Sequence, residues 1–175
     1  MINSLLRTLG YIILFMLIQI LFLNNLHLLR IATPFLYLYI LLKQPVQISY
    51  SSILWLSFFI GLLMDIFGNT LGMHAAVCTL IGFLRNRLIS ILVQKKLPEE
   101  TIPSFHTFGF GVFVRYTAIL VFIHHACLLL LESLSLFDPV FLALRFAACF
   151  TATCVLIFVT ESFNTKNYKK DAAKD

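Results

Sequence analysis

The sequence predicts an all-α integral membrane protein, built as a single bundle of six transmembrane helices. Of its 175 residues, 60% are apolar and only 12% are charged, and the mean hydropathy is +0.94. Soluble domains carry about 25% charged residues, so this composition excludes an ordinary soluble enzyme. The charged residues are also clustered, and the apolar runs between them approach the length of about 20 residues that crosses a hydrocarbon core.

The apolar runs place six helices in one domain of residues 1–165, followed by a charged cytoplasmic tail of residues 166–175. The helices are expected at about residues 5–23, 27–42, 51–67, 71–93, 108–131 and 139–160. The first follows Arg7 as in a secretory signal, but no small-x-small cleavage pattern comes after Leu23. We therefore expect it to stay in the membrane, with Gln19 facing other helices.

The second helix is the weakest prediction, because its apolar run is short and contains Pro34. Proline is tolerated in a first turn, where its missing N–H has no intrahelical partner to lose. A re-entrant segment is the alternative, and it would change the topology. The third helix is expected to end at Gly68, and Asn69 or Thr70 to cap a fourth helix that starts at Leu71, so that the two form a tight hairpin.

The distribution of positive charge indicates which side each loop faces. The one long polar stretch, residues 94–106, and the chain ends hold most of the Lys and Arg residues, whereas the expected outer turn of residues 132–138 holds none. With both ends inside, ten of the 13 basic residues are cytoplasmic: Arg7, Lys43, Arg85, Arg87, Lys95, Lys96, Lys166, Lys169, Lys170 and Lys174. The positive-inside rule then predicts a multi-pass protein of the bacterial cytoplasmic (inner) membrane, with both termini cytoplasmic.

Asp65 is the polar residue most in need of a partner. An aspartate at the centre of a span is unfavourable by about 2.5 to 3.5 kcal/mol, and the last turn of a helix adds an unfavourable dipole. From their depths, we expect Asp65, His74 and Arg145 to form a polar cluster in the outer half of the bundle. The cluster could lock helices together or bind a ligand. Arg115 is expected to snorkel to the cytoplasmic side or to meet Glu161.

The remaining chemistry-bearing residues predict neither an enzyme nor a cofactor or metal site. His124 and His125 could suggest haem ligation with His74, but adjacent side chains on a helix point about 100° apart, so only one is expected to face a partner. No nucleophile with a nearby base, metal-binding motif or phosphate loop is present. The four cysteines lie in apolar runs, as packing residues do, and the basic excess fits cytoplasmic anchoring better than nucleic acid.

Small residues recur on the sixth helix at steps of four. Ala143, Ala147 and Thr151 share one face, and Ala148 and Ala152 share another. Such spacing lets helices approach closely. We expect packing within the bundle, and contact with a partner protein is the alternative.

The run G-L-L-M-D-I-F-G-N-T-L-G-M-H-A-A, from Gly61 to Ala76, resembles the most characteristic stretch of the MreD family of rod-shape-determining proteins. The matching residues are Gly61, Asp65, Gly68, Leu71, Gly72, His74 and Ala75. The match covers about 16 residues in motif and the whole chain in layout. One departure is Phe35, which stands where the family often has a charged or polar residue after the proline.

The resemblance implies a six-helix bundle similar to the substrate-binding subunit of energy-coupling-factor transporters, and a non-catalytic role. Family members work in the cell-elongation complex (elongasome) that regulates cell shape through peptidoglycan synthesis, with MreC, MreB, RodA and a penicillin-binding protein as partners. The alternative function is a small-molecule-binding subunit of a vitamin-type membrane transporter. Such subunits typically present an A-x-x-x-A surface on their first helix, and here that helix has no alanine.

Overall fold

The computed structural model describes residues 10, 12–23, 33–94, 97–133 and 138–171, and their regular structure is helical. An apolar helix covers Ile12–Leu23 and ends in a π-helical turn, η1. The elements in chain order are η1 (Gln19–Leu23), α2 (Leu38–Leu42), α3 (Tyr50–Gly68), α4 (Met73–Leu92), α5 (Phe105–Phe108), α6 (Phe110–Ser133) and α7 (Pro139–Asp171).

Four helices are long and apolar enough to cross a membrane: α3, α4, α6 and the Pro139–Asn164 part of α7. They confirm the prediction of an all-helical protein with membrane spans. Two of the six predicted spans do not appear at that length among the described residues, because the first helix is described only from Ile12 and the second is broken.

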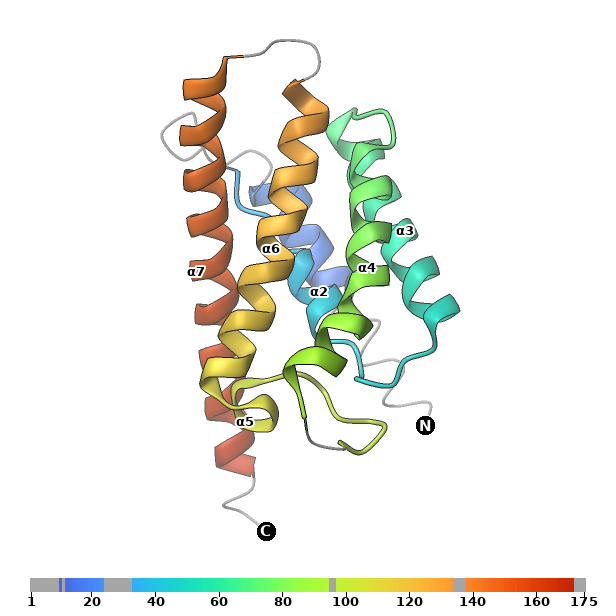
Figure 1. Cartoon of the computed structure of the whole chain (residues 1–175), viewed down its shortest axis with the longest axis vertical. Coiled ribbons are helices and arrows are strands. Elements are labelled where there is room, and N and C mark those ends of the chain that lie inside the picture. The colour runs from blue at the N-terminus through green and yellow to red at the C-terminus, as the bar shows by residue number, and fades with distance from the viewer. Residues whose placement is uncertain (1–9, 11, 24–32, 95–96, 134–137, 172–175) are drawn as a thin grey trace.

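The long helices α7, α6, α4 and α3 stand side by side, with η1 and α2 behind them (Figure 1). α3 packs on α4, α4 on α6, and α6 on α7. We call the end of the bundle that carries residues 69–72, between α3 and α4, the turn end. The opposite end, which carries α5 and residues 97–104, is the loop end (Figure 1).

The prediction of a second helix over residues 27–42 is wrong for those of its residues that the structure describes. Its first part, 27–32, lies outside the described residues, Thr33–Phe35 is not helical, and regular helix covers only Leu38–Leu42. Every side chain from Phe35 to Leu42 is nevertheless buried. A proline followed by an apolar run is therefore compatible with an irregular core segment as well as with a spanning helix.

The backbone of this irregular segment finds its hydrogen-bond partners in two polar side chains. Gln19 Nε2 donates to the Pro34 carbonyl at 3.0 Å, and Gln19 Oε1 accepts from the backbone N–H of Leu36 at 2.6 Å and of Tyr37 at 3.3 Å. Thr153 Oγ1 accepts from the Phe35 N–H at 3.0 Å. Non-helical backbone in an apolar interior requires such partners. Gln19 is fully buried, so it faces the interior as expected, but the partners described here lie in this irregular segment and not in another helix.

Three other helix boundaries differ from the prediction. The expected helix of residues 108–131 is divided into α5 and α6 at Gly109, whose φ of +81° favours glycine. Ser104 caps the start of α5, since its Oγ accepts from the Thr107 N–H at 3.0 Å. α4 starts at Met73 instead of Leu71, and α7 continues to Asp171, well past residue 160.

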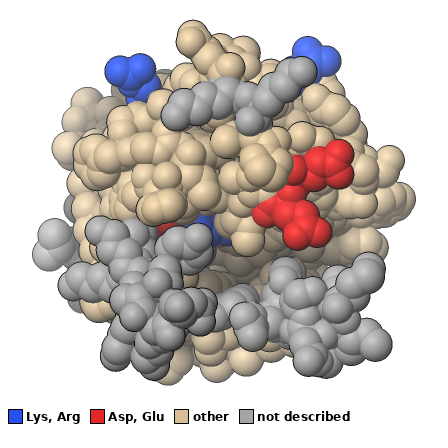
Figure 2. Space-filling model, turned by 90° about the horizontal axis from the view of Figure 1, so that it is seen from below, with Lys and Arg blue, Asp and Glu red and all other residues tan. Residues whose placement is uncertain are grey.

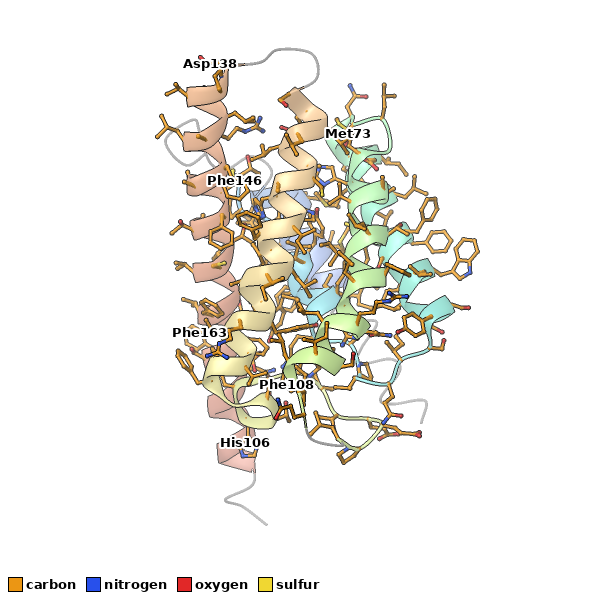
Figure 3. The ribbon with its side chains drawn as sticks, viewed as in Figure 1. Met73, His106, Phe108, Asp138, Phe146 and Phe163 are labelled. Atoms are coloured by element: carbon orange, nitrogen blue, oxygen red, sulfur yellow. The ribbon has the colours of Figure 1, made fainter. Side chains whose placement is uncertain are left out.

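Side chains fill the space between the long helices, as between α6 and α7, where Phe146 lies (Figure 3). There the ring of Phe122 packs edge-on against Phe146, with centroids 5.2 Å apart. Large apolar side chains, Trp55 and Phe59 among them, also cover the outside of the bundle. An apolar exterior over helices of this length is typical of a surface that faces lipid.

Candidate functional site

Asp65 is buried near the end of α3, and its carboxylate caps the start of α4. Oδ1 accepts from the Thr70 hydroxyl at 2.5 Å and from the His74 N–H at 3.0 Å, and Oδ2 accepts from the Ala75 N–H at 2.8 Å. The residue before α4, Gly72, has no side chain that could do this. The carboxylate therefore lies at the positive end of the α4 dipole, which offsets its unfavourable position at the end of α3.

The turn between the two helices depends on two left-handed residues. Asn69 (φ +51°) ends α3, and the N–H groups of Asn69 and Thr70 both donate to the Asp65 carbonyl. Gly72 (φ +76°) precedes α4. We had expected Asn69 or Thr70 to cap α4, but Asn69 terminates α3. Gly68 is the last residue of α3, and Leu71 is 99% exposed in the turn.

Gly61 and Ala75 mark the closest approach of α3 and α4. A Cβ atom on Gly61 would lie 2.5 Å from both the Ala75 Cα and the His74 carbonyl oxygen, which leaves no room for any other residue. About two turns further along α4, a Cβ on Gly82 would collide with the Ser57 side chain. Small residues at such contacts let helix backbones pack closely.

The His74 side chain contacts Tyr37. His74 Nδ1 lies 3.0 Å from the Tyr37 hydroxyl, and His124 Nε2 of α6 lies 2.7 Å from the same oxygen. A hydroxyl has one proton, so Tyr37 can donate to at most one of the two imidazoles, and at least one of the two facing ring nitrogens must carry a proton and donate to Tyr37. Tyr37 therefore joins α4 to α6.

His125 is also buried, and it faces α7. Its Nδ1 lies 2.8 Å from the Val121 carbonyl, and its Nε2 lies 3.2 Å from Thr153 Oγ1. The ring of Phe35 packs against all three imidazoles, with centroids 5.5, 5.5 and 5.3 Å from His74, His124 and His125. We call Tyr37, His74, His124 and His125 the histidine cluster.

The histidine cluster was only partly predictable. We expected only one of His124 and His125 to face a partner, which is wrong: His124 contacts Tyr37, and His125 contacts Thr153 of α7. Tyr37 was missed, because its segment was predicted as an ordinary spanning helix. A tyrosine in the same apolar run as a proline was the available signal, since a buried hydroxyl needs a partner.

Arg145 does not join Asp65 and His74, which corrects the predicted trio. Its Nη1 lies 2.7 Å from Glu132 Oε2, and both side chains are partly exposed. The position of a residue in its helix determines its depth in the bundle but not the direction in which its side chain points. Since α7 packs on α6 while α3 packs on α4, an arginine on α7 meets the end of α6 first.

At the loop end, Glu161 forms a buried ion pair with Lys43. Lys43 Nζ lies 3.0 Å from Glu161 Oε2 and donates to the Pro103 carbonyl at 2.7 Å, while the Tyr39 hydroxyl donates to Glu161 at 2.7 Å. Burial lowers the pKa of Lys43, and the negative charge of Glu161 opposes this effect. Arg115, which we expected as a possible partner of Glu161, is exposed.

Arg85 of α4 lies next to the C-terminal end of α2. It is fully buried, although we expected it to mark the membrane surface. Its guanidinium donates to the carbonyls of Gln44 and Pro45 and to Asn86 Oδ1. A guanidinium carries five N–H donors in a fixed arrangement, so it can bind neighbouring carbonyls together. Arg85 therefore fixes the residues that follow α2, and Arg87 is the exposed arginine of α4.

We expected the small residues of α7 to pack inside the bundle, and they do not. Ala143, Ala147 and Thr151 are exposed, and Ala148 and Ala152 are only half-buried. Of the four candidate spans, α7 is the least buried. The first set of residues therefore presents a surface of small side chains to lipid or to another protein.

Within the described residues, no group of three His, Cys, Asp or Glu side chains is arranged to hold a metal ion. The four cysteines are free thiols. Comparison of the chain with protein-family models, curated proteins and solved structures found no match.

Proposed function

We propose that the chain is a non-catalytic membrane scaffold of the bacterial cell-elongation complex, similar to MreD. The observation that carries this proposal is the use of Asp65. Its carboxylate oxygens are taken up by Thr70 and by the first N–H groups of α4. Together with the close contact at Gly61, this makes the MreD-like motif a device for building a rigid helical hairpin.

The charges at the two ends support an orientation with the loop end in the cytoplasm. Lys43, Arg85 and Arg87 belong to the loop-end half, whereas Glu132 and Asp138 lie at the other end of α6 and α7. The positive-inside rule places the basic end inside. In this orientation the Asp65 cap and the histidine cluster lie in the outer half of an inner-membrane protein.

Two surfaces are available for protein partners. The exposed small-residue face of α7 suits a single transmembrane helix, such as that of MreC, because close helix contacts in membranes use small side chains. At the loop end, the acidic side chains gather on one side of the face (Figure 2), where Glu99 and Glu100 are exposed in the Pro98–Thr101 turn. This turn suits a cytoplasmic partner such as the MreB filament.

Depletion of the protein in its source bacterium tests the proposal. Rod-shaped cells are expected to become round, and affinity purification of the tagged chain is expected to recover MreC, MreB, RodA and a penicillin-binding protein. Re-expression of the chain supplies the control and should restore the rod. Unchanged cell shape together with recovery of transporter ATPases would overturn the scaffold and favour the small-molecule-binding transporter subunit.

A further inference from the structure

The segment from Phe35 to Val46, which is buried from Phe35 to Leu42, runs along the bundle behind α4 and α6 (Figure 1) and is held at both ends. At its first end, Tyr37 is hydrogen-bonded to His74 and His124. The backbone just before it is bound by Gln19 and Thr153. This end is therefore attached to the first helix and to α4, α6 and α7 together.

The second end is attached to α4, α6, α7 and the loop-end segment. The Tyr116 hydroxyl donates to the Leu42 carbonyl at 3.2 Å, and Arg85 binds the carbonyls of Gln44 and Pro45. Lys43 contacts Glu161 and the Pro103 carbonyl, and the Val46 N–H donates to the Thr101 carbonyl at 2.9 Å. The last two contacts reach directly into residues 97–104.

Between these ends the segment is enclosed by the rest of the bundle. Tyr37 and Leu41 are fully buried, and Leu38 and Leu42 are 1% exposed. Close-packed interiors transmit strain instead of absorbing it. A shift of one end of a short packed helix must therefore move the other end or break one of its hydrogen bonds.

We propose that residues 35–46 are a mechanical link, through which a protein bound to residues 97–104 alters the hydrogen bonds of the histidine cluster. The link runs in both directions, because energetic coupling between two sites is reciprocal. It goes beyond the proposed scaffold role, since it follows from the contacts at both ends whatever the partner is. It gives a membrane scaffold a way to transmit partner binding from one side of the bilayer to the other.

A buried thiol reports on this coupling. Cys78 of α4 is 0% exposed and interacts with the Tyr37 hydroxyl. The full-length chain is prepared with Cys78 as its only cysteine, by replacing Cys127, Cys149 and Cys154 with alanine, and is placed in lipid nanodiscs. The rate of alkylation by N-ethylmaleimide is then measured with and without Lys43→Met, which removes the loop-end ion pair.

Lys43→Met is expected to raise the alkylation rate of Cys78 at least about fivefold, the lower end of typical coupling between sites. Arg145→Met is the matched control, since it removes another ion pair of α7 but does not touch the link, and it should change the rate less than about twofold on the same scale. If Lys43→Met does not accumulate, Tyr39→Phe removes the hydroxyl bond to Glu161 and keeps the ring, and its rate should still exceed that of the control.

Two results would overturn the link. One is a Cys78 rate that rises no more with Lys43→Met than with Arg145→Met. The other is an equal rise in a parallel protein whose only cysteine is Cys127, a partly exposed thiol of α6, because that would indicate general loosening of the bundle.

Discussion

Replacing Asp65 with alanine is expected to lower the free energy of unfolding by about 3 kcal/mol. Two α4 backbone N–H groups, of His74 and Ala75, would lose their acceptor in a buried site. A hydrogen bond to a charged group contributes about 1.5 to 3 kcal/mol, and loss of a helix cap costs about 0.5 to 2 kcal/mol. Removal of a buried charge recovers part of that loss, which brings the expected change to about 3 kcal/mol.

Asp65→Asn separates the charge from the shape of the side chain. The amide oxygen can still accept from one α4 N–H, but the amide nitrogen must face the other, donor against donor. We expect a loss of about 2 kcal/mol. Thr70→Ala is the control, because the hydroxyl is only partly buried and its removal leaves both α4 N–H groups bonded; it should cost less than about 1 kcal/mol.

The assay is unfolding in mixed micelles with increasing sodium dodecyl sulfate, followed by circular dichroism, together with amide hydrogen exchange. Exchange should be faster at both His74 and Ala75 in Asp65→Ala, faster at one of the two in Asp65→Asn, and unchanged at both in Thr70→Ala. An Asp65→Ala protein within about 1 kcal/mol of the unsubstituted chain, with protected amides at both positions, would refute the capping role.

Three further changes test other parts of the bundle. Gly61→Ala should cost more than about 2 kcal/mol, because the added methyl meets the backbone of α4, whereas Gly111→Ala, with open space around it, should be neutral or stabilising in the same unfolding assay. Glu161→Leu should cost about 3 kcal/mol, the lower end for breaking a buried ion pair, and equal stability of the variant would show that Lys43 needs no partner. Ala147→Leu on the exposed face of α7 should leave the unfolding transition in place yet reduce MreC recovery in affinity purification, and full recovery would exclude that face as the contact.

The sequence predicted those parts of the fold that follow from the length and composition of apolar runs. Runs of 19 to 26 residues became α3, α4, α6 and the spanning part of α7. The break between α3 and α4 was also predictable, because it depends on local glycine and asparagine. The second segment was not predictable in this way, since its irregular backbone is stabilised by Gln19 and Thr153, which are distant in sequence.

For the candidate site, it was easier to predict which polar residues are buried than to predict which groups they bind. The cost of a charge in an apolar run correctly indicated that Asp65 needs partners, but these are mainly backbone N–H groups, which a search among side chains omits. Arg145 was assigned to Asp65 from depth alone. Such a pairing depends on which helices are adjacent, and hydrophobic periodicity does not specify the order of helices around a bundle.

The capped turn also bears on how the chain enters the bilayer during synthesis. While α3 is alone in the translocon, its carboxylate has no α4 backbone to bind, and lateral release into lipid would expose an aspartate near the end of the helix. Once residues up to Ala75 have emerged and formed the first turn of α4, the carboxylate is hydrogen-bonded within the nascent hairpin. We therefore expect α3 and α4 to partition into lipid together, and α3 to stay at the translocon as long as Ala75 has not emerged from the ribosome.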